Sequence, residues 1–338
     1  MPIITEGFSL KNHNTFGLDV SAKWFAEVHT EQELQEAILW AKEREVDLFL
    51  LGGGSNVLLT QDLDCLVVIN AIKGITVLSQ DENQVLVRAA AGEIWHDLVV
   101  HCIHEEWGGI ENMSLIPGTV GAAPMQNIGA YGVEIKDVFV SLTALHRETL
   151  ETKVFSKDEC QFGYRESVFK RDLKGQYIIT SVTLRLSKKP VVNTTYGAIT
   201  EVLDSKGIAE PSIKDVSEAV IDIRRSKLPD PKQIGNSGSF FKNPVITVTQ
   251  FSELKKQYQI PGYPQEDGQV KVPAGWLIEQ AGWKGKRLGN IGVHDKQALV
   301  LVNHGGGEGS AIYQLAMDIQ ASVQSQFGIE ILPEVNVL

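Results

Sequence analysis

Apolar residues recur every three or four positions in five segments of the chain, the spacing of one buried face on a helix. The first segment runs from Thr30 to Arg44, and Thr30 with Glu33 forms the capping-box pattern that opens helices. Ser212 and Asp215 repeat that pattern before another such segment. The spacing therefore predicts helices over residues 30–44, 93–106, 212–227, 272–281 and 310–327.

Short segments that alternate in polarity, or that are rich in β-branched residues, lie between these helices and predict strands. They cover residues 46–51, 66–69, 84–90, 139–147, 152–155, 177–186 and 298–302. The opening third is thus a small α/β unit, and the whole chain mixes helices with strands. Pro229 and Pro231 end the helix over residues 212–227, so we expect a domain boundary near them.

The length of 338 residues exceeds one ordinary compact domain and suggests two or three. A formal net charge of -11 gives the chain no general attraction to nucleic acid or to anionic membranes. We expect neither as a partner, so an anionic substrate needs a local basic pocket. No apolar run is long enough to span a bilayer, and residues 1–6 do not resemble a signal peptide.

Three widely spaced cysteines without a CxxC pair argue against a disulfide framework and against a structural zinc site. Such usage fits a reducing compartment, so we expect a cytoplasmic protein. His101 and His104, with Asp97 one turn earlier, could form a metal-binding face on the helix over residues 93–106. The opposite face is apolar, so the two histidines are expected to face water and no metal site is predicted.

The first of two glycine-rich segments is Gly52-Gly53-Gly54-Ser55-Asn56, which follows a predicted strand. It can form either a phosphate-binding loop or a plain tight turn. A dinucleotide-binding fingerprint requires a helix directly after the glycines, whereas residues 57–59 are strand-like. Any phosphate at this loop would therefore be bound by another architecture.

The second segment, residues 117–132, consists almost entirely of small side chains. Such a run lets the backbone lie against a flat ligand and offers it many main-chain donors and acceptors. A surface loop is the alternative, but ordinary surface loops carry more charge, and structureless loops of this length are usually functional. The segment therefore favours a ligand-binding role.

Together the two segments resemble the FAD-binding module of the vanillyl-alcohol-oxidase-like flavoproteins. Residues 14–17, 162–167, 227–231, 235–244 and 332–335, with Arg224, narrow the resemblance. In this order they resemble the UDP-N-acetylenolpyruvoylglucosamine reductase family from about residue 10 to the C-terminus. Residues 190–205, which contain Tyr196, resemble the tyrosine-bearing insertion of the family's long form, and Ser237 stands where the family often has alanine.

The resemblance implies an α+β protein. A vanillyl-alcohol-oxidase-like FAD-binding fold of two α/β subdomains, residues 1–75 and 76–225, would precede a C-terminal α+β substrate-binding domain, residues 226–338. The implied reaction is the NADPH-dependent, FAD-mediated reduction of UDP-N-acetylglucosamine enolpyruvate to UDP-N-acetylmuramate in peptidoglycan precursor synthesis. We expect a monomer. The FAD would be bound non-covalently, because neither glycine-rich segment contains the Cys or His that such enzymes use for attachment.

The family's functional residues carry over to matching positions. Arg165 would stabilise the charge that builds on the substrate carboxylate, and Ser239 would donate the proton, with Gly238 permitting close approach. Glu334 would complete the site as a hydrogen-bond donor in its protonated form. By spacing alone, Arg165 also fits a solvated surface and Ser239 a plain Ser-Gly turn.

The remaining implied residues bind the ligands. The implied substrate contacts are Tyr164, Tyr196, Lys227, Asn243, Lys284 and Gln297. The implied FAD contacts are Gly52, Gly53, Gly54, Ser55, Asn56, Pro117, Gly118, Thr119, Gly121, Ala122, Asn127, Gly129, Ala130, Tyr131 and Arg224.

Two other functions are compatible with parts of this sequence. An alcohol or sugar oxidase of the same fold would react with oxygen and ignore NADPH. An inactive flavin- or UDP-sugar-binding sensor would not need Arg165, Ser239 and Glu334 together, and the chain has all three.

Overall fold

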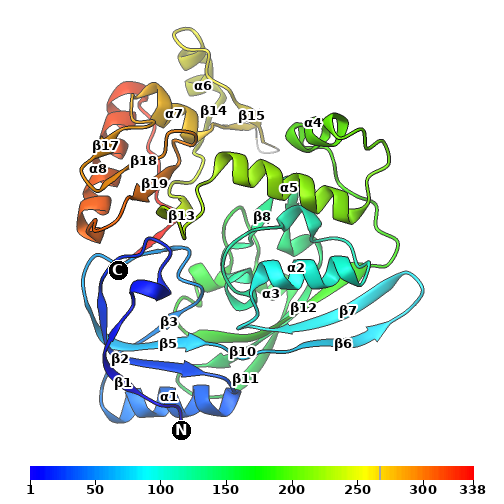
Figure 1. The fold of residues 1–338 in the computed structure, drawn as a ribbon, viewed down its shortest axis with the longest axis vertical. Coiled ribbons are helices and arrows are strands. Elements are labelled where there is room, and N and C mark those ends of the chain that lie inside the picture. The colour runs from blue at the N-terminus through cyan, green and yellow to red at the C-terminus, as the bar shows by residue number, and fades with distance from the viewer. Residues whose placement is uncertain (266–267) are drawn as a thin grey trace. The chain divides into compact units, whose positions relative to one another are not determined.

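A computed structural model describes residues 1–265 and 268–338 (Figure 1). The chain separates into two compact units. The first unit contains residues 1–8, 22–53 and 63–226, and the second contains residues 9–21, 54–62 and 227–338. The predicted three-part division of the chain stays a prediction.

A four-stranded sheet of order β1-β2-β5-β3 opens the first unit. Its strands are β1 (Thr5–Ser9), β2 (Ser21–Val28), β3 (Leu48–Leu51) and β5 (Leu63–Asn70), and β5 pairs in parallel with β2 and β3. Helix α1 (Glu31–Glu43) buries the predicted apolar face against this sheet, in one cluster with Leu66 and Val68. Thr30 caps the helix, since its side chain accepts the N–H of Glu33 at 3.1 Å.

The first unit also holds a five-stranded antiparallel sheet of order β11-β10-β12-β7-β6. Its strands are β6 (Ile75–Gln80), β7 (Gln84–Ala90), β10 (Phe139–His146), β11 (Thr152–Ser156) and β12 (Tyr177–Ser187). Helix α2 (Trp95–His104) packs Trp95 and Leu98 into the same core as Val182 of β12. A short helix, α3 (Lys157–Cys160), follows β11. Apart from β6, the sequence pattern predicted these strands and α2 to within a few residues.

The predicted insertion forms helix α4 (Gly197–Ser205), which shares a small core with helix α5 (Ile213–Lys227). Ile199 and Leu203 of α4 pack there with Val216 and Val220 of α5. The predicted cap of α5 is confirmed, because the N–H of Asp215 donates to the Ser212 hydroxyl at 3.3 Å and the N–H of Ser212 donates to the Asp215 carboxylate at 2.8 Å.

In the second unit, a four-stranded antiparallel sheet has the order β13-β19-β18-β17. Helix α8 (Gly309–Phe327) buries the predicted stripe of Ile312, Leu315, Ile319 and Val323. The sheet consists of β13 (Gly235–Ser239), β17 (Arg287–Leu288), β18 (Ile291–Val293) and β19 (Val300–Asn303), and helix α7 (Ala274–Gln280) precedes β17.

Smaller elements complete the second unit. Strands β14 (Val245–Thr247), β15 (Tyr263–Pro264) and β16 (Gln269–Lys271) form a sheet that follows the order β14-β16-β15, and α6 (Val248–Lys255) directly follows β14. The last strand, β20 (Asn336–Val337), pairs in parallel with β4 (Val57–Leu58). Within the residues that the structure describes, no helix combines the length and the apolar character needed to cross a membrane.

Candidate active site

The two predicted glycine-rich segments meet in the first unit. A Cβ atom on Gly53 would lie 3.0 Å from the Cα of Gly118, so a side chain at this position would press the two backbones apart. A Cβ on Gly52 would lie 3.4 Å from the Thr119 hydroxyl oxygen. Strand β4, not a helix, follows the first segment, which confirms that the loop is not a dinucleotide-binding fingerprint.

The rest of the first segment belongs to the second unit, where it holds the C-terminal strand. The side-chain amide of Asn56 donates to the carbonyl oxygen of Glu334 at 3.3 Å, and the N–H of Asn336 donates to the carbonyl of Asn56 at 3.1 Å. Gly54 accepts the N–H of Thr15 at 3.0 Å, and Ser55 lies between Gly54 and Asn56. The Glu334 segment is therefore anchored to the residues that follow Gly53.

The segment of residues 117–132 lies along the start of α2 and the end of β7. The N–H of Trp95 donates to the carbonyl of Gly118 at 3.0 Å, and the N–H of Gly121 donates to the carbonyl of Ala91 at 2.9 Å. Two short 3₁₀ helices, η3 (Val120–Ala122) and η4 (Pro124–Gln126), follow, and then strands β8 (Gly129–Ala130) and β9 (Val133–Glu134). Pro117 is exposed, whereas Ala122 and Ala130 are partly buried, so this is not a loose surface loop.

Asn127 is fully buried, and its amide holds the segment together. The amide nitrogen donates to the carbonyl of Gly163 and to the carboxylate of Glu134, both at 3.0 Å, and the amide oxygen accepts the N–H of Lys136 at 3.2 Å. Because these bonds occupy the side chain, any contact of Asn127 with a cofactor would involve its main chain.

Two arginines come together beside this segment. Arg165 has a left-handed backbone with φ of 54°, and its Nη2 donates to the carbonyl of Gly129 at 2.9 Å. Arg224, on α5, hydrogen-bonds the hydroxyl of Tyr131. Burial lowers the pKa of Arg224, and the nearby charge of Arg165 lowers it further.

The environment of Arg224 suits an anionic or hydrogen-bond-accepting ligand. Its Nε atom is buried and has no hydrogen-bond partner in the part of the chain that the structure describes. Burial raises the pKa of the Tyr131 hydroxyl, which keeps it a neutral partner for the guanidinium. The ring of Tyr196 meets that of Tyr131 edge to face at 5.2 Å. The structure thus brings Arg165, Arg224, Tyr131 and Tyr196 into one cluster.

In the second unit, Ser239 and Glu334 lie on adjoining stretches of chain. Phe240 accepts the main-chain N–H of Glu334 at 2.8 Å, and Phe241 forms a β-bridge with Pro333. Ser239 is exposed and Glu334 is partly buried. Phe240 and Phe241 are buried, as expected for side chains that anchor this turn.

The orientation of Ser239 depends on a β-bulge in β13. The pairing with β19 is regular at Asn236, shifts across the next two residues, and resumes at Ser239 opposite Val300. Gly238 lies in the bulge with φ of 70°, and a Cβ there would meet nothing within 4 Å. Within the chain, Gly238 is therefore required for its left-handed backbone, and close approach of a ligand at this position stays a prediction.

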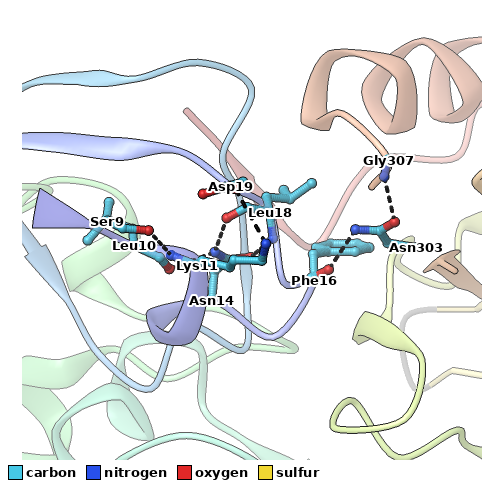
Figure 2. A network of polar contacts seen from close by, with 9 residues as sticks. All are labelled: Ser9, Leu10, Lys11, Asn14, Phe16, Leu18, Asp19, Asn303 and Gly307. Atoms are coloured by element: carbon cyan, nitrogen blue, oxygen red, sulfur yellow. Dashed lines mark hydrogen bonds and ion pairs between the residues drawn. The ribbon is translucent and has the colours of Figure 1, made fainter. Parts of the chain in front are cut away.

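Two buried asparagines, Asn14 and Asn236, lie in motifs of the resemblance and support this strand. The amide of Asn236 accepts the N–H of Gly238 at 2.9 Å and donates to the carbonyl of Ile234 at 2.8 Å. Figure 2 shows Asn14, which donates to the carbonyls of Leu10 and Leu18 and fixes the turn between them. Thr15 in this turn accepts the N–H of Asn236 at 2.9 Å. Residues 14–17, a motif of the resemblance, thus brace the strand that carries Ser239.

The predicted substrate contacts lie on separate elements. Tyr164 is exposed beside Arg165, in the first unit with Tyr196. In the second unit, Lys227 is exposed, and the Asn243 amide oxygen accepts the N–H of Ala274 at 2.9 Å. Lys284 forms an ion pair with Glu279 at 2.9 Å, and Gln297 accepts the N–H of Leu299 at 3.4 Å.

Metal ligands do not cluster in the described residues: no group of three or more His, Cys, Asp or Glu side chains there could hold an ion. His104 is exposed, as predicted, with 83% of its side chain accessible. His101 is partly buried and packs its ring edge to face with that of Trp107 at 5.9 Å.

Comparisons with known proteins point to one family. A family model described as UDP-N-acetylenolpyruvoylglucosamine reductase, C-terminal domain, matches residues 230–338, and one described as FAD binding domain matches residues 22–149. The chain is 52% identical over 337 residues to the UDP-N-acetylenolpyruvoylglucosamine reductase of Flavobacterium johnsoniae, covering 99% of each protein. It is 49% identical over 335 residues to that of Pseudomonas aeruginosa, covering 99% of this chain and 98% of that one.

Solved structures show the fold. The reductase from Thermus caldophilus has a TM-score of 0.68 at 21% identity, covering 100% of this chain and 98% of that one. A solvent-stable cholesterol oxidase has a TM-score of 0.51 at 13% identity, covering 98% of this chain and 86% of that one. The predicted α+β, vanillyl-alcohol-oxidase-like fold is confirmed. The chain belongs to the UDP-N-acetylenolpyruvoylglucosamine reductase family.

Proposed function

We propose that this protein reduces the enolpyruvyl ether of UDP-N-acetylglucosamine to the lactyl ether of UDP-N-acetylmuramate, with NADPH as electron donor and FAD as carrier. The product serves peptidoglycan precursor synthesis. The observation that carries the proposal is the pair of Arg165 and Arg224 beside the small-residue segment, in a chain 52% identical to a reductase of that name over nearly its whole length.

The residues present fit FAD. The close approach of Gly53 to Gly118 leaves main chain without side chains where the two segments meet, which suits a pyrophosphate and a flat ring system. The unpaired Nε of Arg224 supplies a buried donor beside Tyr131. When bound, FAD supplies the hydride chemistry, accepting a hydride from NADPH and passing it to the substrate.

Reduction of the enolpyruvyl double bond adds a hydride at its terminal carbon and a proton at the adjacent carbon. Negative charge therefore develops at the adjacent carbon and spreads onto the carboxylate. Arg165 places a permanent positive charge and a fork of donors against that carboxylate. Its bond to the carbonyl of Gly129 holds the guanidinium at the cofactor segment, and the like charge of Arg224 nearby adds to the positive potential there.

Ser239 donates the proton to the carbon. A serine hydroxyl is a weak acid, so it needs a fixed position and a strongly basic acceptor, which the developing carbanion is. The bulge at Gly238 and the buried pair Phe240 and Phe241 fix that position. Glu334, held beside this turn by its bond to Phe240, completes the site next to the developing enolate.

Tyr196, Lys227 and Asn243 bind the UDP part of the substrate. Lys284 and Gln297 contact it near the sugar and diphosphate, and Tyr164 is a further substrate contact. Lys227 contributes local positive charge, which an anionic substrate needs because the chain as a whole carries -11. The protein acts as a cytoplasmic monomer, and its three free cysteines fit that compartment.

The test records the visible spectrum of the purified protein, first alone, then with NADPH without oxygen, then with the enolpyruvyl substrate. The flavin band should bleach with NADPH and return with substrate. Ser239→Ala should still bleach, but its band should return about 100-fold more slowly. Ser205→Ala, which removes an exposed hydroxyl at the end of α4, should match the wild type.

Two other outcomes would change the assignment. If the band bleaches and only oxygen restores it, the protein is an oxidase of the same fold and the proposed substrate is wrong. If the protein binds no flavin even when FAD is supplied, the proposed chemistry fails altogether.

A further inference from the structure

Asn112 joins two segments that are far apart in the sequence. It lies in the 3₁₀ helix η2 (Glu111–Met113), and none of its surface is exposed. Its amide nitrogen donates to the carbonyl of Tyr131 at 3.1 Å and to the carbonyl of Asn193 at 2.8 Å. One hydrogen of the amide therefore binds the small-residue segment, and the other binds the insertion that carries Tyr196.

The orientation of the Asn112 amide is fixed. Reversing it would point the amide oxygen at two carbonyl oxygens, which repel it. In the observed orientation, the amide oxygen is buried and has no hydrogen-bond partner within the described chain. The unpaired amide oxygen lowers stability, so the favourable contribution of this asparagine comes from the two hydrogen bonds that its amide nitrogen donates.

The helix that carries Asn112 is itself anchored. The hydroxyl of Ser114 donates to the carbonyl of Glu111 at 2.6 Å and lies 2.8 Å from the hydroxyl of Ser217 on α5, and both serines are buried. The carboxylate of Glu111 accepts the N–H of Gly109 at 2.6 Å. Asn112 thus projects from a rigid base rather than from a free loop.

Two further contacts join the same segments. The ring of Tyr196 packs edge to face on that of Tyr131 at 5.2 Å, and the amide of Asn193 donates to the carbonyl of Gly132 at 3.4 Å. Tyr131 also packs against the apolar core that α4 and α5 share. Asn112, whose side chain is fully buried, adds the hydrogen bonds that join the main chain of Tyr131 to that of the insertion.

We propose that Asn112 is a positioning residue, which fastens the Tyr196-bearing insertion to the Tyr131 segment and couples the two. A ligand that orders the Tyr131 segment then also orders the insertion, and by linkage the reverse holds. This inference rests on the proposed function in one respect only, that FAD binds at Tyr131 and the UDP substrate at Tyr196. Binding of FAD would then order the insertion whose Tyr196 contacts the substrate.

The deciding experiment measures backbone hydrogen exchange in residues 193–203, with and without FAD, in the wild type and in Asn112→Ala. Wild-type exchange should slow about tenfold when FAD binds. In Asn112→Ala, exchange should be about tenfold faster, and FAD should no longer slow it. Ser205→Ala, in the same insertion but without a contact to the Tyr131 segment, should behave as the wild type.

A steady-state measurement gives a second readout. Asn112→Ala should raise the KM for the enolpyruvyl substrate about tenfold while kcat stays within about threefold, because the reacting groups are untouched.

If exchange in residues 193–203 is the same in Asn112→Ala and Ser205→Ala, Asn112 does not join the two segments. If Asn112→Ala does not fold, the wild-type protein with and without FAD provides the test. Equal exchange in residues 193–203 under the two conditions would refute the coupling. Absence of enolpyruvyl turnover in the wild type would refute the proposed function, while the exchange data would still decide whether Asn112 joins the two segments.

Discussion

The main-chain N–H of Glu334 donates to the carbonyl oxygen of Phe240 at 2.8 Å. With the β-bridge between Phe241 and Pro333, this bond places the C-terminal segment next to Ser239, although the two proposed catalytic residues are separated by most of the second unit in sequence. Phe240 is fully buried, so the shared backbone cannot shift without disturbing the core. Ser239, the proposed proton donor, and Glu334 are thus positioned by packing within the second unit.

Asn236→Ala should impair both stability and turnover. The substitution leaves the N–H of Gly238 and the carbonyls of Ile234 and Pro229 without their partner, which we expect to cost about 2 kcal/mol of unfolding free energy. The bulge then loosens and Ser239 moves, so kcat should fall about 10- to 100-fold. Urea denaturation and steady-state kinetics measure the two effects, with exposed Gln233→Ala as the control. Wild-type kcat in Asn236→Ala would show that the bulge does not position Ser239.

Ser237→Ala should not destabilise the protein. The hydroxyl of Ser237 is buried and has no hydrogen-bond partner in the described chain, so its removal relieves a desolvation cost and should leave the unfolding free energy unchanged or raise it by about 1 kcal/mol. The matched substitution Ser167→Ala removes a buried hydroxyl that donates to the carbonyl of Met125 at 2.7 Å. It should cost about 1 kcal/mol. Equal losses in the two variants, measured by urea denaturation, would contradict this account.

Stability should fall in mild acid because of His96. Its Nδ1 accepts the N–H of Leu115 at 3.0 Å, and burial lowers its pKa below the ordinary 6.5, with Arg225 and Arg224 lowering it further against the opposing effect of Asp97. The unfolded chain therefore binds this proton more readily than the folded chain. The contribution to stability is complete above pH 6.5 and is lost as the pH falls from there toward the lower folded pKa.

His96→Asn tests this pH dependence, since the asparagine oxygen can accept the same N–H but does not titrate. Between about pH 7.5 and pH 5, the variant should lose roughly half a kcal/mol less unfolding free energy than the wild type, a figure reduced for partial solvent exposure. Burial also lowers the pKa of His294 and His304, but both remain in the two proteins and cancel in the comparison. His104→Asn, at an exposed position, should show the pH dependence of the wild type. If His96→Asn also shows the wild-type pH dependence, His96 is not the cause of the loss in acid.

Hydrophobic pattern predicted the elements that bury a regular face. The stripe of α8 and the seven residues of β7 follow directly from apolar spacing. Strand β6 was missed because it is an edge strand with five exposed residues, and it carries no alternating pattern. Strand β13, with the sequence GNSGS, has no apolar residue at all. It forms because β19 and the turn at Thr15 supply its hydrogen bonds, which no local pattern encodes.

The same distinction applies to the site. The glycine-rich segments could be found because small residues at close approach are unusual in sequence, as Gly53 against Gly118 shows. The role of Asn112 could not be found, and that of Asn236 could not be read from its motif, since each bonds to main-chain carbonyls whose residue types carry no signal. Asparagines are common in turns, and only the three-dimensional contacts separate these two from the rest.

Arg224→Lys should weaken FAD binding, because lysine keeps the charge but has neither the Nε donor nor the planar fork. That Nε is buried and unpaired beside Tyr131, so a ligand acceptor that pairs with it gains a desolvated, charge-assisted hydrogen bond. We expect the Kd for FAD to rise about tenfold, which corresponds to about 1.4 kcal/mol. Titration of flavin-free protein, followed by quenching of FAD fluorescence, measures this affinity. Arg225→Lys, at the exposed next position of α5, should leave the Kd unchanged. If both variants bind FAD as the wild type does, Arg224 does not bind the cofactor. The positive charges of Arg165 and Arg224 would then act on the substrate carboxylate alone.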